Sequence, residues 1–193
     1  MSIEFEVKFS ADPARQAAIR QALPLEFQAI RMHTTYFDTE DFALSARHIT
    51  LRRRMENGRS VCTVKAPVSG LGRGEWECLC ENIEDAIPML CQLGAPRELL
   101  LLTAAGVSPV CGARFTRLAG LLEYEGAKLE LALDNGVLYG GGREIDLCEV
   151  EVELKSGQPE AAIALGQELV DRFDLMVEKK SKFRRALALA KGE

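Results

Sequence analysis

Apolar and polar residues alternate along most of the chain, a pattern that predicts β-strands. Residues 3–9 alternate throughout, and residues 49–55 and 60–65 do so on either side of Asn57-Gly58, a dipeptide typical of tight hairpins. The same period covers the other predicted strands, at residues 74–81, 113–124, 128–134, 137–139 and 143–155. About eight strands joined mainly by tight turns predict an antiparallel sheet.

Helical patterns lie between these strands. Residues 13–23 follow Asp12, a favourable N-cap residue, and begin with proline. The other predicted helices cover residues 83–93, 96–105, 158–173 and about 182–190. Asn135-Gly136 and the three glycines at 140–142 are predicted to be turns.

Charged residues occupy almost all of the polar positions in the predicted strands. Glu149, Glu151 and Glu153, for example, follow one another on a single face of the last strand. Solvent-exposed faces usually mix uncharged polar residues with charges, and neighbouring like charges repel. For one strand alone, exposure to solvent is the commoner explanation. For the whole set of strands, charged rows that face inward and bind cations explain the pattern better than solvent exposure does.

The number of strands allows the sheet to close on itself. With the charged faces inward, the prediction is an α+β fold: a closed eight-stranded antiparallel β-barrel with a charged interior and helices packed outside. We expect residues 1–193 to form this single domain.

The mixture of acidic and basic side chains indicates a ligand class. Carboxylates bind hard divalent cations such as Mg²⁺ or Mn²⁺. Arginine and lysine bind phosphate oxygens. A polyphosphate chelated to a metal ion needs both kinds of side chain, carboxylates for the metal and arginine or lysine for the phosphates. The glycines at positions 70, 72 and 74 do not form a Walker-type loop, so the expected site is not a P-loop.

Several short motifs occur in an order that resembles the CYTH family, also called triphosphate tunnel metalloenzymes. Glu4-Phe5-Glu6-Val7-Lys8 matches the family's N-terminal E-x-E-x-K motif. The other similar segments are Tyr36-Phe37-Asp38-Thr39, Leu51-Arg52-Arg53-Arg54, Thr63-Val64-Lys65, Arg73-Gly74-Glu75, Arg117, residues 130–136, residues 149–154, and Ser181-Lys182 with Arg185. The resemblance covers nearly the whole chain and is strongest to the bacterial inorganic-triphosphatase branch.

This resemblance implies a tunnel in which Mg²⁺ or Mn²⁺ assists hydrolysis of a small-molecule triphosphate. The implied phosphate-binding residues are Lys8, Arg52, Arg54, Lys65, Arg117, Lys182 and Arg185. The implied metal ligands are Glu4, Glu6, Glu149, Glu151 and Glu153. The implied catalytic residues are Glu4, Glu6, Lys8 and Glu151, with one glutamate orienting water. Further tunnel-lining residues are Glu75, Glu77, Glu130 and Asp134. Arg114 differs from Arg117 in strand phase, so it is the weaker candidate for phosphate binding.

Composition limits the classes of molecule that the protein is expected to bind. A net charge of -5 argues against a nucleic-acid binder, and no apolar run is long enough for a membrane helix. Residues 1–10 lack the apolar core of a signal peptide, which predicts a cytoplasmic protein whose six cysteines are reduced. The leucine run at 99–102 fits either a core or a dimer contact, so both a monomer and a homodimer remain open.

Three other functions remain open at this point. The same scaffold carries adenylate cyclases and thiamine triphosphatases in this family, but the sequence marks neither organic group. Trp76, the only tryptophan, is out of phase with Glu75 and Glu77 and is expected to pack beneath a helix rather than to stack on a substrate. The third alternative is a non-catalytic polyphosphate-binding module, which the full acidic rows disfavour.

Overall fold

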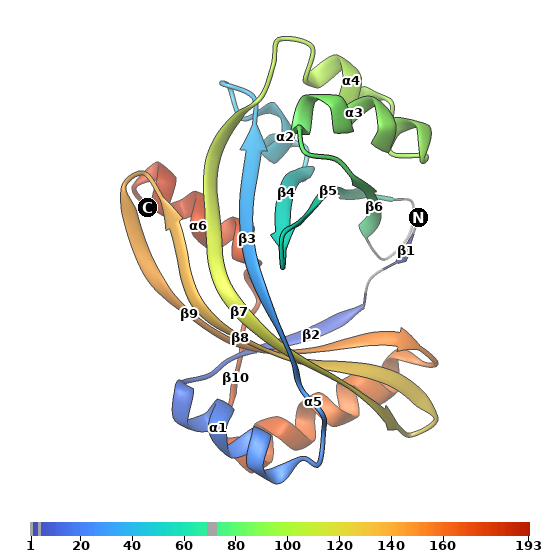
Figure 1. Cartoon of the computed structure of the whole chain (residues 1–193), viewed down its shortest axis with the longest axis vertical. Helices are drawn as coiled ribbons and strands as arrows, with labels where there is room; N and C mark the ends of the chain where they lie inside the picture. The colour runs from blue at the N-terminus through green and yellow to red at the C-terminus, as the bar shows by residue number, and fades with distance from the viewer. Residues whose placement is uncertain (1, 4, 69–72) are drawn as a thin grey trace.

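The computed structural model describes residues 2–3, 5–68 and 73–193, with side chains from Phe5 onward. Its centre is one antiparallel sheet of ten strands in the order β1-β6-β5-β4-β3-β7-β8-β9-β2-β10 (Figure 1). The strands are β1 (Ser2–Ile3), β2 (Glu6–Ser10), β3 (Gln28–Asp38), β4 (Thr50–Glu56), β5 (Arg59–Pro67), β6 (Arg73–Leu79), β7 (Ser108–Tyr124), β8 (Ala127–Gly140), β9 (Arg143–Ser156) and β10 (Met176–Val177).

The expected closure of the barrel is not confirmed. The hydrogen-bonded ladder of the described residues is open, with β1 and β10 at its edges. Ile3 pairs with Gly74 of β6, whereas the carbonyl of Phe5 accepts a hydrogen bond from Leu154 of β9, so the N-terminal segment passes from one end of the sheet to the other. Within the described residues, β2 pairs with β9 on one edge and with β10 on the other, and it does not pair with β6.

Helices cover the outer face of the curled sheet at two places (Figure 1). The helices α2 (Ala43–Ala46), α3 (Ile83–Gln92) and α4 (Glu98–Leu102) pack over β4, β5 and β6 around one apolar core. The helices α1 (Pro13–Ala22) and α5 (Pro159–Phe173) pack against β2, β8 and β9 around a second core. These five helices bury the apolar faces of the strands, so the charged faces line the concave side.

The last helix, α6 (Lys182–Lys191), departs from the expectation that all helices pack outside. Phe183, Ala186 and Leu187 of α6 form a third core with Met32 and Tyr36, residues whose side chains lie on the concave face of β3. The helix therefore fills one end of the concave side. None of the helices in the described parts of the chain is long and apolar enough to cross a lipid bilayer.

Most predicted elements are present, and two differences are informative. Residues 28–38 form β3, which the sequence pattern did not predict because the polar pair Thr34 and Thr35 interrupts the apolar alternation. Asn135-Gly136 is not a turn but the middle of β8. A side chain at Gly136 would lie 2.1 Å from the carbonyl oxygen of Arg114, so glycine is needed here for close packing of two strands rather than for a turn.

Candidate active site

The concave face of the sheet encloses a cavity of about 420 Å³ lined mainly by charged side chains. We call it the central cavity. Twelve of the residues predicted from the sequence line it: Glu6, Lys8, Arg52, Arg54, Lys65, Glu75, Glu77, Arg117, Glu130, Glu151, Glu153 and Lys182. The predicted residue Glu4 lies outside the described residues.

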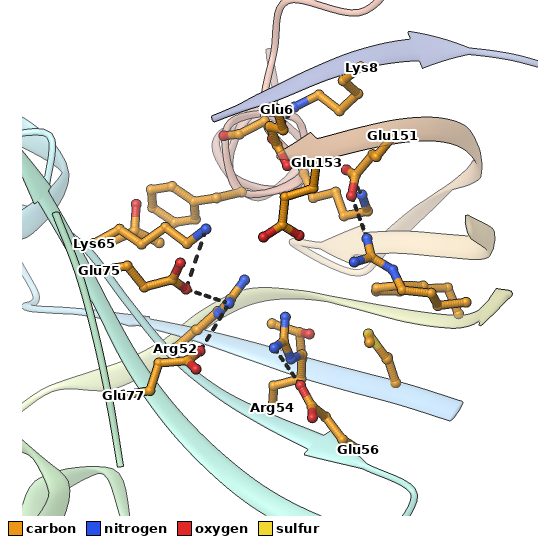
Figure 2. Close-up of a pocket in the computed structure, with 18 of the residues that line it drawn as sticks. Glu6, Lys8, Arg52, Arg54, Glu56, Lys65, Glu75, Glu77, Glu151 and Glu153 are labelled. Carbon is orange, nitrogen blue, oxygen red and sulfur yellow. Dashed lines mark hydrogen bonds and ion pairs between the residues drawn. The ribbon is translucent and has the colours of Figure 1, made fainter. Parts of the chain in front are cut away.

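One wall of the central cavity comes from β4, β5 and β6 and carries paired cations and carboxylates. Arg52 Nη2 lies 3.2 Å from Glu75 Oε1 and 3.8 Å from Glu77 Oε1, and Lys65 Nζ lies 3.5 Å from the same oxygen of Glu75 (Figure 2). The strand register sets this arrangement, because Lys65 is directly opposite Glu75 on β6. The carboxylates of β6 therefore hold the cations of the neighbouring strands in place on the cavity wall.

Arg54 is the next inward-facing residue of β4. Its Nη2 pairs with Glu56, while its buried Nε has no hydrogen-bond partner. Burial lowers the pKa of Arg54, and the nearby charge of Arg52 lowers it further. A buried guanidinium with an unused donor carries an energetic cost that an anionic ligand in the cavity would remove.

The opposite wall carries a row of three glutamates from adjacent strands. Glu153 of β9 is directly opposite Glu6 of β2 on one side and Glu130 of β8 on the other. Lys155 Nζ lies 2.9 Å from Glu153 and 3.5 Å from Glu130, but its side chain is 37% exposed to solvent. Like charges in directly opposite positions destabilise a sheet, so this acidic row is a suitable place for an additional cation.

Behind the cavity wall lies a cluster of three buried carboxylates and three cations. Asp134 accepts hydrogen bonds at 2.7 Å from both Nε and Nη2 of Arg117, and it lies 2.8 Å from Lys182 Nζ. Lys182 also contacts Glu151 at 2.6 Å and pairs with Glu149. The remaining ion pairs join Arg117 to Glu151 and, at 2.6 Å, Arg185 to Glu149. The cluster is thus electrically balanced, with three negative and three positive groups.

The pKa shifts follow from this packing. Burial works to raise the pKa of Glu151, but the charges of Lys182 and Arg117 outweigh it and hold that pKa well below its usual range. Burial raises the pKa of Glu149 in spite of the nearby Lys182. Burial works to lower the pKa of the Lys182 ammonium group, but the charges of Glu151, Asp134 and Glu149 outweigh burial and raise that pKa. These carboxylates therefore favour the charged form of Lys182, which faces the cavity.

Three predicted residues do not line the cavity: Asp134, Glu149 and Arg185. Asp134 and Glu149 are fully buried. Oxygen atoms of Asp134, Glu149 and Glu151 lie within 4.8 Å of one another, a spacing compatible with a metal ion. However, Lys182 already contacts all three carboxylates, so a metal ion would have to displace an ammonium group. The donor set therefore fits lysine better than a metal.

The structure also adds residues that the sequence did not single out as site residues. Glu56 and Lys155 line the cavity, and both continue an alternating charged row that was visible in the sequence. The aromatic rings of Tyr36, Phe115 and Phe183 line it as well. Phe115 and Phe183 carry no sequence signal, because an isolated phenylalanine on a strand or helix is indistinguishable from a core residue.

Two expectations about individual residues are confirmed. Arg117 faces the cavity, whereas Arg114 lies on the outer face and pairs with Glu144 at the surface. Trp76 is 5% exposed and packs in the core beneath α3, so it does not contact the cavity.

A profile of the CYTH domain family matches residues 2–187. The chain belongs to this family. An inorganic triphosphatase of Haemophilus influenzae is 29% identical over 194 residues, covering 96% of this chain and 54% of that protein. The chain thus spans about half the length of that CYTH relative.

Solved structures show the same fold. HpAC1 of Hippeastrum, for which a dominant triphosphatase activity is described, aligns with a TM-score of 0.62 and 20% identity over 100% of this chain and 97% of that chain. The PH1819 protein of Pyrococcus horikoshii aligns with a TM-score of 0.62 and 21% identity over 95% of this chain and 98% of that chain. At these identities the similarity establishes the CYTH fold alone.

Proposed function

We propose that this chain hydrolyses inorganic triphosphate to diphosphate and phosphate with the help of Mg²⁺ or Mn²⁺. The observation that carries the proposal is that the central cavity is lined by both cations and carboxylates, which include Arg52, Arg54 and Lys65 on one wall and the row of Glu6, Glu153 and Glu130 on the opposite wall. A metal-chelated triphosphate presents both phosphate oxygens and a divalent cation, and the cavity offers side chains that are complementary to each.

The phosphates would bind to the basic residues that face the cavity: Lys8, Arg52, Arg54, Lys65, Arg117 and Lys182. The unpartnered Nε of Arg54 supports this assignment, since a phosphate oxygen would accept its hydrogen bond. Arg185 does not reach the cavity; it pairs with Glu149 and Glu178, and we assign it the role of fixing the α6 end of the cavity wall.

The acidic row fits a divalent cation better than the buried cluster does. Glu6, Glu153 and Glu130 offer carboxylates to the cavity from three adjacent strands. Lys8 Nζ lies 3.4 Å from Glu6, and Lys155, which pairs with Glu153 and Glu130, is 37% exposed. We propose that these glutamates hold the metal and that Glu151 instead fixes Arg117 and Lys182. A bound Mg²⁺ or Mn²⁺ would polarise the phosphoryl oxygens and neutralise their charge.

The side chains of the protein have three tasks in this reaction. The cations hold the triphosphate in an extended position and stabilise the charge that spreads over its oxygens. We propose that one of the cavity carboxylates orients a water molecule toward the terminal phosphorus. The buried carboxylate of Glu151 holds the cations Arg117 and Lys182 in fixed positions, and the low exposure of these side chains strengthens their electrostatic contacts.

The relative from H. influenzae supports an inorganic substrate, because that protein is named an inorganic triphosphatase. The aromatic rings of Tyr36, Phe115 and Phe183 leave an organic triphosphate as the second candidate, since they could contact a base or a thiazolium ring. We further propose that the enzyme acts in the cytoplasm, where its six free thiols would remain reduced.

The test is phosphate release from tripolyphosphate, ATP and thiamine triphosphate, each measured with Mg²⁺, with Mn²⁺ and with a chelator. Metal-dependent release from tripolyphosphate well above that from the organic substrates is the expected result. Pyrophosphate formed from ATP would identify a cyclase instead. Absence of turnover with all three substrates, combined with tripolyphosphate binding, would reduce the protein to a binding module.

The roles of the carboxylates are tested by two variants. Glu153→Gln should weaken the dependence on metal concentration, because it removes a carboxylate from the acidic row. Glu149→Gln should leave that dependence unchanged, because Glu149 does not reach the cavity. If the Glu149 variant alone changed the metal dependence, our assignment of the metal to the acidic row would be wrong.

A further inference from the structure

A buried glutamine joins the main chains of two strands from the outer side of the sheet. Gln16 of α1 is 7% exposed, and its Nε2 donates hydrogen bonds to the carbonyl oxygen of Asp134 at 3.0 Å and to that of Glu149 at 2.9 Å. Asp134 of β8 and Glu149 of β9 are directly opposite each other in the strand register. One side-chain amide therefore connects the backbones of both strands at a single register position.

The same register position carries the buried carboxylates on the other side of the sheet. Leu133 and Val150, the neighbours of Asp134 and Glu149 in the sequence, lie in the core that α1 covers. Since side chains alternate along a strand, the two carboxylates point away from α1 and toward α6. There Lys182 Nζ lies 2.8 Å from Asp134 and pairs with Glu149 as well. The strands β8 and β9 thus lie between α1 and α6 (Figure 1).

The packing of α1 does not itself require a polar residue at position 16. Gln16 and Ile19, three residues apart, are the buried residues of this helix, and such positions are normally apolar. A buried amide is costly unless it is hydrogen-bonded, and the two strand carbonyls meet this requirement. What the glutamine adds is a fixed position of β8 and β9 relative to α1.

We propose that Gln16 is a positioning residue that sets the location of Lys182 in the central cavity by fixing the backbone that carries its carboxylate partners. The proposal rests on the proposed function, in which Lys182 binds a phosphate of the substrate. Lys182 lines the cavity, whereas Asp134 and Glu149 do not. A shift of these two carboxylates would therefore reach the substrate through the cations that they hold.

The kinetic test uses Gln16→Leu, which removes both hydrogen bonds and keeps a side chain of similar size. At a temperature where the variant is folded, we expect kcat for tripolyphosphate to fall about tenfold, because a small misplacement of a charged group weakens transition-state stabilisation. KM should change less than kcat, since the cation remains in the cavity. A role in stability alone would leave both constants unchanged under these conditions.

Two control variants lie on the same helix. Ile19→Val shortens the other buried side chain of α1 without touching the carbonyls of β8 and β9, so it should lower the melting temperature and leave kcat unchanged. Gln21→Leu replaces an exposed glutamine and should change neither quantity.

A second readout does not depend on turnover. The side chain of Lys182 is 11% exposed and its Nζ contacts three carboxylates, so an amine-reactive ester should label it slowly. If Gln16 fixes this cluster, Gln16→Leu should label Lys182 about three- to tenfold faster, because local opening becomes more frequent. Mass spectrometry of the labelled peptides measures this rate, with the exposed Lys128 as internal reference. Ile19→Val should leave the rate unchanged.

The outcomes separate this inference from the proposed function. In a protein that hydrolyses tripolyphosphate, the inference requires both the fall in kcat and the faster labelling of Lys182, and the absence of either would overturn it. Equal effects of Gln16→Leu and Ile19→Val would also overturn it, because they would show a general loosening of α1. If the wild type hydrolyses no triphosphate, the proposed function fails, whereas selectively faster labelling in Gln16→Leu would still support Gln16 as the residue that positions Lys182.

Discussion

Asp134 offers the sharpest test of how two cations of the cavity, Arg117 and Lys182, are held in place. Its carboxylate is fully buried and takes no part in lining the central cavity, yet it binds both Arg117 and Lys182. The substitution Asp134→Asn keeps the shape of the side chain, removes its charge and places an amide where one of the arginine donors now points. We expect it to destabilise the fold and to reduce turnover without removing any group that contacts substrate.

The magnitude follows from the contacts that remain. Removing one partner of a buried ion pair costs about 3–5 kcal/mol because the other charge is left uncompensated. Arg117 would retain Glu151, and Lys182 would retain Glu149 and Glu151, so we expect about 3 kcal/mol, the lower end of this range. For a chain of this size, that loss corresponds to a decrease in melting temperature of roughly 6–12 °C.

Urea unfolding of the wild type and the variant measures this loss directly. The matched control is Glu144→Gln, which removes the carboxylate of an ion pair with Arg114 whose side chains are 53% and 54% exposed. We expect the control to cost less than about 1 kcal/mol, because solvent screens exposed pairs. A loss for Asp134→Asn that is no larger than the control would refute our view of the buried cluster.

A kinetic measurement separates positioning from a general loss of stability. If Asp134 orients the guanidinium of Arg117, kcat for tripolyphosphate should fall about 10²-fold at a temperature where the variant is fully folded. The double variant Asp134→Asn/Arg117→Met should then lose less than the sum of its parts, by about 1 kcal/mol or more. Strictly additive losses would mean that the two side chains act independently.

Three further predictions address pH, phosphate binding and packing. Because the pKa of Glu151 is held well below its ordinary value of 4.5, this group stabilises the fold above that value and loses the contribution as the pH falls through the lowered pKa. Urea unfolding at neutral and acid pH should therefore show a smaller acid-induced loss in Glu151→Gln, and an unchanged acid loss would contradict the assignment. Arg54→Lys keeps the charge but loses the unpartnered Nε, so KM for tripolyphosphate should rise about tenfold, and an unchanged KM would argue against a phosphate contact. Gly136→Ala should cost about 1–3 kcal/mol in thermal unfolding because of the 2.1 Å approach to the Arg114 carbonyl, whereas the control Gly120→Ala, whose nearest contact would be 3.4 Å, should cost little. Equal effects of the two glycine substitutions would refute the packing argument.

Local patterns in the sequence predicted most of the strands, the helices near the chain ends and the direction of the charged rows. The alternation of Arg52 with Arg54 and of Glu151 with Glu153 needs only the two-residue period of a strand, and all four side chains face the cavity. The hairpin at Asn57-Gly58 is confirmed, with both residues at positive φ. The same rule wrongly predicted a turn at Asn135-Gly136, because the choice between turn and strand there depended on the neighbouring strand β7.

Closure of the barrel was also beyond the reach of local patterns. Strand count and alternation are compatible with a closed sheet, but closure requires both edges of β2 to pair within the ring. Residues 176–178, far away in the sequence, occupy one of these edges. A short segment such as β10 carries almost no alternation signal, so its position emerges only when the whole chain is folded.

What the sequence determined by itself, then, is the chemistry of the concave face, because side-chain direction along a strand is a local property. The division of its acids into cavity-facing and buried groups was decided by tertiary structure. Glu149 and Glu153 lie on one face of β9 and are equivalent in the sequence, yet Lys182 and Arg185 of α6 cover the first and leave the second open to the cavity. The physical reason is that a carboxylate's role depends on which distant cation desolvates and neutralises it, and α6 brings those cations into place from the other end of the chain.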